Sequence, residues 1–465
     1  MKKDINNKSY LVIGAARSGL AAAHLLKNHG FEVTVADSKS PSQLAAVVRE
    51  LNDADIPYMF GTGEGDNPSL GGWDVLALSP GVPPSIPLIQ EARRLGIEVI
   101  GEIELGYCFS SNPILAITGT NGKSTTTLLA EAMLKSGKIP AIASGNVGYA
   151  FCRAIQKGLP ENGIHVVEIS SYQLETIKSF RPHIAAILNI RPDHLARHGN
   201  MENYKKAKFR LTENQQANDF LILNADDALC LEVADITEAA TRFFSVKKEV
   251  SPGAFLKGDS LYFSMEDGKA ERFMSRNEIP LPGLHNVQNI LAAGLTALSA
   301  GVSPAAIADA VKAFPGVEHR IEFVGNIDGV DYYNDSKATN LDSLRVALLS
   351  FDRPVVLIAG GRDKGEDYST LNSLISKHVR KIIAMGESAP LIESTWQTLI
   401  PVTRVSNMEE AVEMAAMEST RGEVVLLSPG ASSFDAYTDF EERGRVFKEV
   451  FNQYRSQNMK AEEAG

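Results

Sequence analysis

Apolar residues in this chain gather in short runs that are separated by stretches long enough to form helices. Runs rich in Val, Ile, Leu and Ala and bounded by Gly, Pro, Asn or Asp are typical of strands buried on both faces of a parallel sheet. The pattern therefore predicts an α/β protein in which strands and helices alternate. The predicted strands are Tyr10–Ile13, Phe31–Ala36, Trp73–Leu78, Ile114–Ile117, His165–Ile169, Ala185–Ile190, Val330–Asp335, Val355–Ala359, Lys381–Ala384, Val402–Val405 and Val424–Ser428.

The length of the chain indicates several domains, because 465 residues exceed what one hydrophobic core holds at about 150 residues per domain. A linker rich in Ser and Asn, Ser110–Pro113, follows the first group of strands, and the pattern changes again near Phe314–Arg320. We predict three domains: a Rossmann-like domain over residues 1–101, a central P-loop ATPase-type α/β domain over 102–316, and a Rossmann-like domain over 317–465.

The first predicted strand is followed by a glycine turn and a helix, as in a nucleotide-binding fold. Gly14 and Gly19 bracket the turn, and Asp37 ends the second strand, where a ribose or a base is bound in such folds. Ala16 replaces the middle glycine of the GxGxxG fingerprint, which disfavours NAD or a flavin relative to another nucleotide. The alternative is that the two glycines only allow the strand and the helix to pack closely.

The strand Ile114–Ile117 leads into Thr118–Gly122 and then into a helix that begins near Lys123. Two glycines, the helix N-terminus and a lysine together form a cradle for phosphate, and Ser124 or Thr125 supplies a hydroxyl for Mg²⁺. Only two residues separate the glycines, whereas the common P-loop has four. The alternative is a strand-to-helix turn with a Ser or Thr cap.

One carboxylate, Glu168, lies inside an otherwise apolar strand. A buried carboxylate is costly unless it is paired or binds a cation, so the nearby phosphate loop favours ATP with Mg²⁺, and a structural salt bridge is the alternative. His194 follows the next strand and becomes a second candidate at the same edge. Asn286 and Asn289 lie three residues apart on one helical face and are candidates for contacting an adenine.

Charge and cysteine content limit the classes of function. A net charge of −11 disfavours non-specific binding to nucleic acid or to an anionic membrane. Three cysteines without CxxC spacing predict neither a disulfide framework nor a thiolate metal site. The N-terminus lacks the apolar region of a signal peptide, and we expect a cytoplasmic protein. The lysines of the segment 203–210 are expected, from composition alone, to form a solvated face.

Three motifs together resemble the Mur ligases, the ATP-dependent amino-acid ligases of peptidoglycan precursor synthesis. Gly119–Ser124 (GTNGKS) is similar to the phosphate loop of this family and accounts for the short spacing. Asp335–Asn340 (DSKATN) and Leu427–Asp435 (LSPGASSFD) resemble the members that add D-glutamate. The resemblance implies an ATP-dependent amide-forming ligase with a UDP-linked acceptor substrate, two Mg²⁺ ions and no nucleic-acid or membrane partner, and we expect a monomer.

The resemblance also implies a role for each matching residue. Lys123, His194 and Lys208 would be catalytic, with Lys208 carbamylated by CO₂ so that it becomes an anionic metal ligand. The other implied sites are ATP (Gly119, Thr120, Asn121, Gly122, Lys123, Ser124, Thr125, Asn286, Asn289, Arg320, Asp335), metal (Ser124, Glu168, His194, Lys208), UDP-substrate (Arg17, Ser18, Asp37, Ser38, Lys39, Gly81, Asn146, His194) and D-glutamate (Thr339, Lys364, Ser433, Phe440).

Three rival functions explain part of the sequence. A folylpolyglutamate synthase shares the ATP domain, but the complete N-terminal nucleotide fold and the motif Asp335–Asn340 weigh against it. An NAD-dependent oxidoreductase leaves Lys123 and Glu168 without a role. A non-catalytic P-loop switch does not require an amino-acid substrate.

Overall fold

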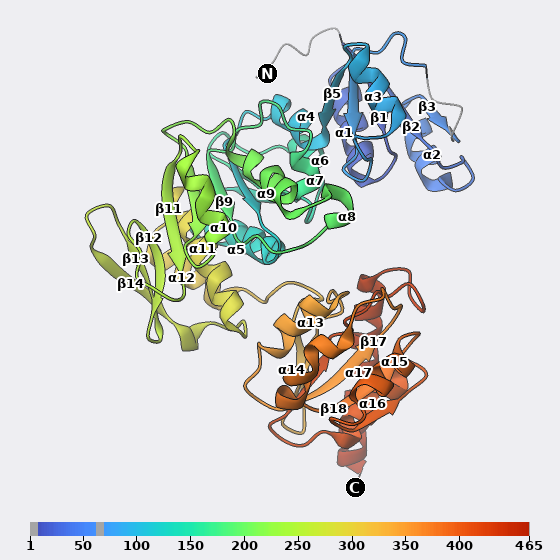
Figure 1. Ribbon diagram of the computed structural model, residues 1–465, viewed down its shortest axis with the longest axis vertical. Coiled ribbons are helices and arrows are strands. Elements are labelled where there is room, and N and C mark those ends of the chain that lie inside the picture. Colours follow the sequence, from blue (N-terminus) through green and yellow to red (C-terminus); the bar gives the residue numbers. More distant parts are fainter. Residues whose placement is uncertain (1–7, 62–68, 465) are drawn as a thin grey trace. The chain divides into compact units, whose positions relative to one another are not determined.

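A computed structural model describes residues 8–61 and 69–464 and arranges them around three β-sheets (Figure 1). The chain divides into two compact units. The first contains the residues up to Glu278 together with Val287–Phe314, and the second contains Ile279–Asn286 together with the residues from Pro315 onward. Each sheet lies within one of the three segments that the sequence predicts, and the predicted α/β fold class is confirmed.

The first sheet has the strand order β3-β2-β1-β4-β5, and all of its strands are parallel. Alternate residues of β1 point to opposite faces, so that Tyr10 and Val12 pack with α1 whereas Leu11 and Ile13 pack with α3. This is the doubly wound arrangement that the strand-turn-helix pattern predicts. The elements are β1 (Ser9–Ile13), α1 (Arg17–Asn28), β2 (Glu32–Asp37), α2 (Ala45–Asp53), β3 (Tyr58–Phe60), β4 (Val75–Leu78), α3 (Pro87–Arg94) and β5 (Glu98–Gly101).

The second sheet has the order β14-β13-β12-β11-β10-β9-β6-β8-β7; it is parallel from β7 to β12 and ends in two antiparallel strands. Its strands are β6 (Ile114–Thr118), β7 (Ala141–Gly145), β8 (Ile164–Glu168), β9 (Ile184–Ile187), β10 (Phe220–Asn224), β11 (Ala240–Ser245), β12 (Gly253–Lys257), β13 (Ser260–Ser264) and β14 (Ala270–Ser275). The associated helices are α4 (Glu102–Phe109), α5 (Lys123–Ser136), α6 (Phe151–Lys157), α7 (Ser171–Leu174), α8 (Leu195–His198), α9 (Met201–Phe209), α10 (Ala228–Leu231), α11 (Leu284–Ser299) and α12 (Pro304–Ala313).

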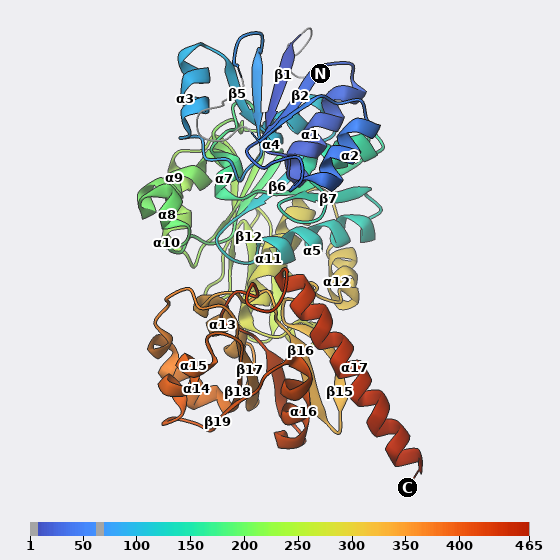
Figure 2. The same ribbon diagram turned by 90° about the vertical axis from the view of Figure 1, so that its right-hand side faces the viewer.

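The third sheet, in the second unit, has the order β15-β16-β20-β17-β18-β19, and only its pair β15-β16 is antiparallel. Its strands are β15 (Glu322–Ile327), β16 (Val330–Asn334), β17 (Val355–Gly360), β18 (Val379–Met385), β19 (Val402–Arg404) and β20 (Val424–Leu427). Its helices are α13 (Leu341–Leu348), α14 (Asn372–His378), α15 (Ala389–Trp396), α16 (Met408–Glu418) and α17 (Phe440–Ala464). Alternating residues of β17 separate two apolar cores, one under α13 to α15 and one under α16 and α17 (Figure 2).

In each sheet the loops that carry polar candidates leave the carboxyl ends of neighbouring parallel strands. Ligands bind at this edge in open α/β sheets. None of the described helices combines the length and the apolar character that crossing a membrane requires.

Candidate active site

The predicted phosphate loop joins β6 to α5, and α5 begins at Lys123. Gly122 has φ 85°, a left-handed conformation, and a Cβ atom there would lie 2.3 Å from Oδ1 of Asn289. Nζ of Lys123 donates to the carbonyl oxygens of Gly119 at 3.0 Å and Thr120 at 2.7 Å. The loop therefore folds around the lysine and needs glycine at its last position.

Asn189, which sequence reasoning missed, holds this loop in place. Its Oδ1 accepts the backbone N–H groups of Thr120 at 3.1 Å and Asn121 at 2.8 Å, and its Nδ2 donates to the carbonyl oxygen of Asn121 at 3.0 Å. Asn189 follows β9, which pairs with β6 in the sheet. The sequence analysis placed Asn189 inside the predicted strand Ala185–Ile190, whereas β9 ends at Ile187; a polar residue near the end of an apolar run is the only signal that the sequence offers.

Glu168 ends β8 opposite Ile117 of β6, and its side chain is buried with 1% of its surface exposed. Nδ2 of Asn146 donates to its Oε1 at 2.7 Å, whereas its Oε2 has no hydrogen-bond partner among the described residues. A buried carboxylate oxygen that lacks a donor fits a divalent cation. The alternative, a salt bridge of Glu168, is not formed among the residues that the structure describes.

No group of three or more His, Cys, Asp and Glu side chains in the described part of the chain is placed to hold a metal by itself. Mg²⁺ at a nucleotide site does not need such a group, because it takes one or two carboxylates and completes its shell with phosphate oxygens and water. Ser124, at the start of α5, is buried next to Lys123 and supplies a hydroxyl of the expected kind.

Lys208 corrects the expectation of a solvated lysine face. Its side chain is 1% exposed, its Nζ donates to the carbonyl oxygen of Gly119 at 2.8 Å, and Nζ lies 4.6 Å from the centre of the Tyr204 ring. Burial, followed by the charge of Lys123, lowers the pKa of Lys208 well below its usual value. Composition could not show this, because Lys206 on the same helix is indeed largely exposed.

His194 precedes α8 and has a left-handed backbone with φ 53°. Its ring lies 4.9 Å from the ring of Tyr172, and its Nε2 lies 3.4 Å from Oδ2 of Asp193. Half of its side chain is exposed. His194 is therefore accessible at the same edge of the second sheet as the phosphate loop.

The carboxyl edge of the first sheet carries the predicted UDP-substrate residues. The carboxylate of Asp37 accepts the N–H groups of Ala15 at 2.7 Å and Lys39 at 2.9 Å and so joins the glycine turn to the loop after β2. A Cβ atom on Gly19 would lie 1.9 Å from the carbonyl oxygen of Gly14, so close packing alone already requires this glycine. Ser18 lies in α1, whereas Ser38 and Gly81 are exposed in loops.

Arg17 connects this edge to the second sheet within the first unit. Its guanidinium donates to the carbonyl oxygens of Gly148 at 2.9 Å, Gly145 at 3.4 Å and Asn146 at 3.5 Å. These carbonyls belong to the end of β7 and to the loop after it, which carries the Asn146 side chain to Glu168. The structure thus brings predicted residues of the UDP-substrate and metal groups together.

The second unit carries the remaining candidates at the edge formed by β16, β20 and β17. Asp335 follows β16 and is buried, its Oδ2 accepts from Oγ of Ser428 at 2.7 Å, and its Oδ1 accepts from the N–H of Ile321 at 3.2 Å. Burial raises the pKa of Asp335 to about 7, and the charge of Arg320 opposes this shift. Nε of Arg320 is buried without a hydrogen-bond partner among the described residues.

The predicted D-glutamate residues also lie at this edge. Thr339 follows β16, Lys364 lies in the exposed loop after β17, and Ser433 lies in the loop after β20. Phe440 begins α17, and its carbonyl oxygen accepts from Oγ of Ser336 at 2.8 Å. The two predicted adenine residues are both buried: Nδ2 of Asn286 donates to the carbonyl oxygen of Pro282 in the second unit, and Oδ1 of Asn289 accepts from Oγ1 of Thr126 in the first.

Comparison with protein families gives three matches that follow one another along the chain. Residues 8–101 match the Mur ligase MurD-like N-terminal domain, residues 117–297 match the Mur ligase middle domain, and residues 319–430 match the Mur ligase glutamate ligase domain.

Comparison with individual proteins gives similarity over nearly the whole chain. A UDP-N-acetylmuramoylalanine--D-glutamate ligase of Koribacter versatilis is 43% identical over 458 residues, which are 98% of this chain and 100% of that protein. A protein of the same name from Caldicellulosiruptor bescii is 42% identical over 470 residues, covering 98% and 100%. The crystal structure of a UDP-N-acetylmuramate-alanine ligase from Thermotoga maritima superposes with a TM-score of 0.60 at 20% identity, covering 96% of this chain and 100% of that chain, and shares the fold.

Proposed function

This chain belongs to the Mur ligase family, and from that premise we propose that it is an ATP-dependent ligase that adds D-glutamate to UDP-N-acetylmuramoyl-L-alanine. The choice of D-glutamate is supported by relatives of that name, which are similar over their full length, and by the match of residues 319–430 to a glutamate ligase domain. The observation that carries the ATP-dependent chemistry is the buried Glu168 carboxylate, whose Oε2 has no donor in the described structure, beside a phosphate loop.

The reaction joins an unreactive carboxylate to an amine in two steps. An oxygen of the L-alanyl carboxylate attacks the γ-phosphorus of ATP, the bond from that phosphorus to the bridging oxygen breaks, and ADP leaves. The D-glutamate amine then attacks the carbonyl carbon of the acyl phosphate, loses a proton, and expels inorganic phosphate as the amide forms. Lys123 neutralises charge on the transferring phosphoryl group.

Mg²⁺, when bound, would neutralise the phosphate charge that the chain cannot neutralise alone. Ser124 and Glu168 would hold one ion, and His194 with a carbamate on Lys208 would hold a second. Carbamate formation requires a neutral amine, which attacks CO₂ and releases a proton. The burial of Lys208 lowers the pKa of its ammonium group and so favours the neutral amine.

The remaining assignments follow the three sheets. Arg17, Ser18, Asp37, Ser38, Lys39, Gly81 and Asn146 would bind the UDP part, and Asn286, Asn289, Arg320 and Asp335 would bind the nucleoside and a phosphate of ATP. Thr339, Lys364, Ser433 and Phe440 would bind D-glutamate. We also propose that the protein acts in the cytoplasm as a monomer.

The proposal is tested by phosphate release with UDP-N-acetylmuramoyl-L-alanine, ATP and one amino acid at a time. We expect release only with D-glutamate, and ¹⁸O in the substrate carboxylate should appear in the inorganic phosphate. Turnover with L-glutamate and a folate, or ¹⁸O confined to the amide product, would overturn it. For Lys208, ¹³C-bicarbonate should give a carbamate carbon signal in the wild type that is absent in Lys208→Arg.

A further inference from the structure

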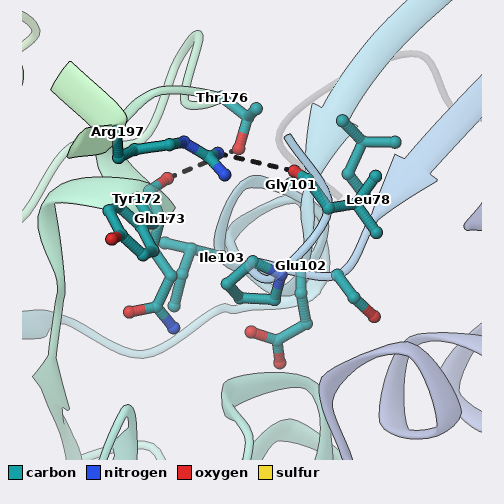
Figure 3. Close-up of a pocket in the computed structure, with 11 residues that line it drawn as sticks. Leu78, Gly101, Glu102, Ile103, Tyr172, Gln173, Thr176 and Arg197 are labelled. Carbon is teal, nitrogen blue, oxygen red and sulfur yellow. Dashed lines mark hydrogen bonds between the residues drawn. The ribbon is translucent and has the colours of Figure 1, made fainter. Parts of the chain in front are cut away.

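Three side chains surround the ring of Tyr172 in α7, next to the candidate His194. The centres of the His194 and His198 rings lie 4.9 and 5.6 Å from the centre of the Tyr172 ring. The guanidinium carbon of Arg197, which Figure 3 shows beside Tyr172, lies 4.7 Å from the same centre. His194 itself is half exposed. Its ring is restrained by Tyr172 on one side and by the Asp193 carboxylate, 3.4 Å from its Nε2.

Arg197 holds Tyr172 from one side through a largely buried ion pair. Its Nη2 lies 2.7 Å from Oε2 of Glu175, and the two side chains are only 16% and 18% exposed. Oε1 of the same carboxylate lies 3.5 Å from Nδ1 of His198, whose Nε2 lies 3.0 Å from Oγ of Ser171. Glu175, just after α7, is thus held by Arg197 and His198 of α8, so movement of the arginine would break this pair and its contact with the Tyr172 ring.

Arg197 also reaches the first sheet. Its Nη2 donates to the carbonyl oxygen of Val82 at 3.5 Å, in the turn that follows β4. The N–H of Val82 donates to the carbonyl oxygen of Ser79, and Oγ of Ser79 donates to the carbonyl oxygen of Gly14 at 2.9 Å. Arg197, Tyr172 and Val82 line one small pocket together with Leu78 and Gly101 of the first sheet (Figure 3).

We propose that Arg197 is a positioning residue that orients His194 through Tyr172 and connects it to the glycine turn of the first domain. Occupation of that turn by a uridine diphosphate group would then be sensed at His194 before any metal or ATP binds. This inference deepens the proposed function and depends on it for the role of His194.

Arginine suits this position better than lysine would. The guanidinium is planar, so it can lie on the Tyr172 ring while separate N–H groups point to Glu175 and Val82. An ammonium in the same place is a point charge that can pair with Glu175 but cannot keep all three contacts. Arg197→Lys should therefore keep the positive charge but lose the simultaneous contacts with the Tyr172 ring, Glu175 and Val82.

The test follows the ring signal of His194 by NMR in protein labelled only at its nine histidines, assigned with His194→Gln. UDP alone is the probe, without ATP or Mg²⁺. In the wild type we expect UDP to shift the His194 signal, and in Arg197→Lys we expect UDP to bind but this shift to be lost. The matched control is Arg181→Lys, because Arg181 forms a similar ion pair with Asp219 at 2.7 Å and contacts neither α7 nor the turn; it should keep the shift.

The outcomes separate this inference from the function on which it rests. Failure of UDP to bind the wild type would contradict the proposed role of the first domain. UDP binding without a shift of His194 in the wild type, or with an equal shift in Arg197→Lys, would overturn the role of Arg197. In the ligase assay the Mg²⁺ concentration for half-maximal rate should rise about tenfold or more in Arg197→Lys, with KM for D-glutamate unchanged.

A second pair of variants tests the same contact without touching the ion pair. Tyr172→Phe keeps the ring and should keep the UDP-induced shift of His194. Tyr172→Leu keeps the apolar volume but not the stacking surface, and the shift should be lost. If Tyr172→Phe and Tyr172→Leu gave the same UDP-induced shift of the His194 signal, the inference would be overturned even if Arg197→Lys failed to fold.

Discussion

Single side chains decide the shape of the phosphate loop. Asn189 satisfies two backbone N–H groups and one carbonyl oxygen of the loop with a single amide, which only asparagine or glutamine can do. These bonds order the loop before ATP binds. ATP binding therefore does not lose free energy to the ordering of the loop.

We predict that Asn189→Asp weakens ATP binding more than it weakens folding. A carboxylate still accepts from Thr120 and Asn121, but it cannot donate to the carbonyl oxygen of Asn121, and its charge opposes the ATP phosphates. KM for ATP should rise at least about tenfold, equivalent to ~1.4 kcal/mol. Asn218→Asp, the same change at an exposed position, is the control and should leave KM for ATP unaltered.

Glu102 predicts a pH dependence of stability. Its Oε1 accepts the N–H of Cys152, its Oε2 has no partner within the described structure, and burial raises its pKa to about 7 from an ordinary 4.5. Between these values the folded protein holds a proton that the unfolded chain has released. The free energy of unfolding therefore falls as pH rises from about 4.5 to 7 and remains lower above that range.

Glu102→Gln cannot ionise and should remove this dependence. Between pH 5 and pH 8 the variant should gain stability relative to the wild type, on the order of 3 kcal/mol. Urea unfolding at the two pH values measures the difference. If the free energies of unfolding of variant and wild type differ by the same amount at pH 5 and at pH 8, Glu102 is ionised in the folded protein, which would contradict this prediction.

At the scale of elements, the hydrophobic pattern was sufficient for strands and helices that pack with their own neighbours. β1, β6 and β8 were predicted correctly because buried parallel strands are continuous apolar runs. The loop glycines, Lys123 and Glu168 could be selected as candidates from the sequence, since each is chemically unusual in its local sequence. Asn189 and Tyr172 were missed, because their roles depend on which strands become neighbours, and Lys208 was recognised only through family resemblance.

Helix α4 illustrates a contact of this non-local kind. The carboxylate of Glu104 is fully buried and accepts the N–H groups of Lys178, Ser179 and Phe180, each at 2.9 Å. These donors belong to a loop more than seventy residues further along the chain. Nothing near Glu104 in the sequence indicates this partner.

Glu104→Gln should therefore destabilise the first unit. An amide has a single acceptor oxygen, so buried N–H groups of the loop lose their partner, at a cost of about 3 kcal/mol. The control is Glu91→Gln, which breaks an exposed pair with Arg94 on α3 and should cost less than about 1 kcal/mol. Chemical denaturation of both variants at one pH makes the comparison, and equal losses would contradict the buried-carboxylate argument.

At the scale of the whole molecule, candidate residues for phosphate transfer and for amino-acid binding belong to different compact units. Lys123, Glu168 and Lys208 lie in the first unit, whereas Lys364 and Ser433 lie in the second. A substitution in the first unit should therefore alter the kinetic constants for ATP, whereas a substitution in the second unit should alter those for the amino acid.

Lys364→Met should raise KM for D-glutamate about tenfold to a hundredfold, because it removes one charge-assisted contact worth ~1.5–3 kcal/mol to a substrate carboxylate. KM for ATP and for the UDP-substrate should stay within about twofold, since such an effect would be under ~0.5 kcal/mol. Lys377→Met, an exposed lysine of α14 in the same unit, is the control. Equal increases for all substrates would indicate general damage rather than loss of an amino-acid contact.

Helix α4 begins one residue after the last strand of the first sheet, and Glu104 fastens it to the loop 178–180. The N–H of Gly101 also donates to the carbonyl oxygen of Thr176. The first two sheets are thus joined by a short and rigid junction. A chimaera whose N-terminal domain comes from a relative must preserve this junction. Such a chimaera should fold stably only when an acidic residue stands at the position of Glu104. A glycine-serine spacer inserted after Gly101 should lower the stability of the first unit.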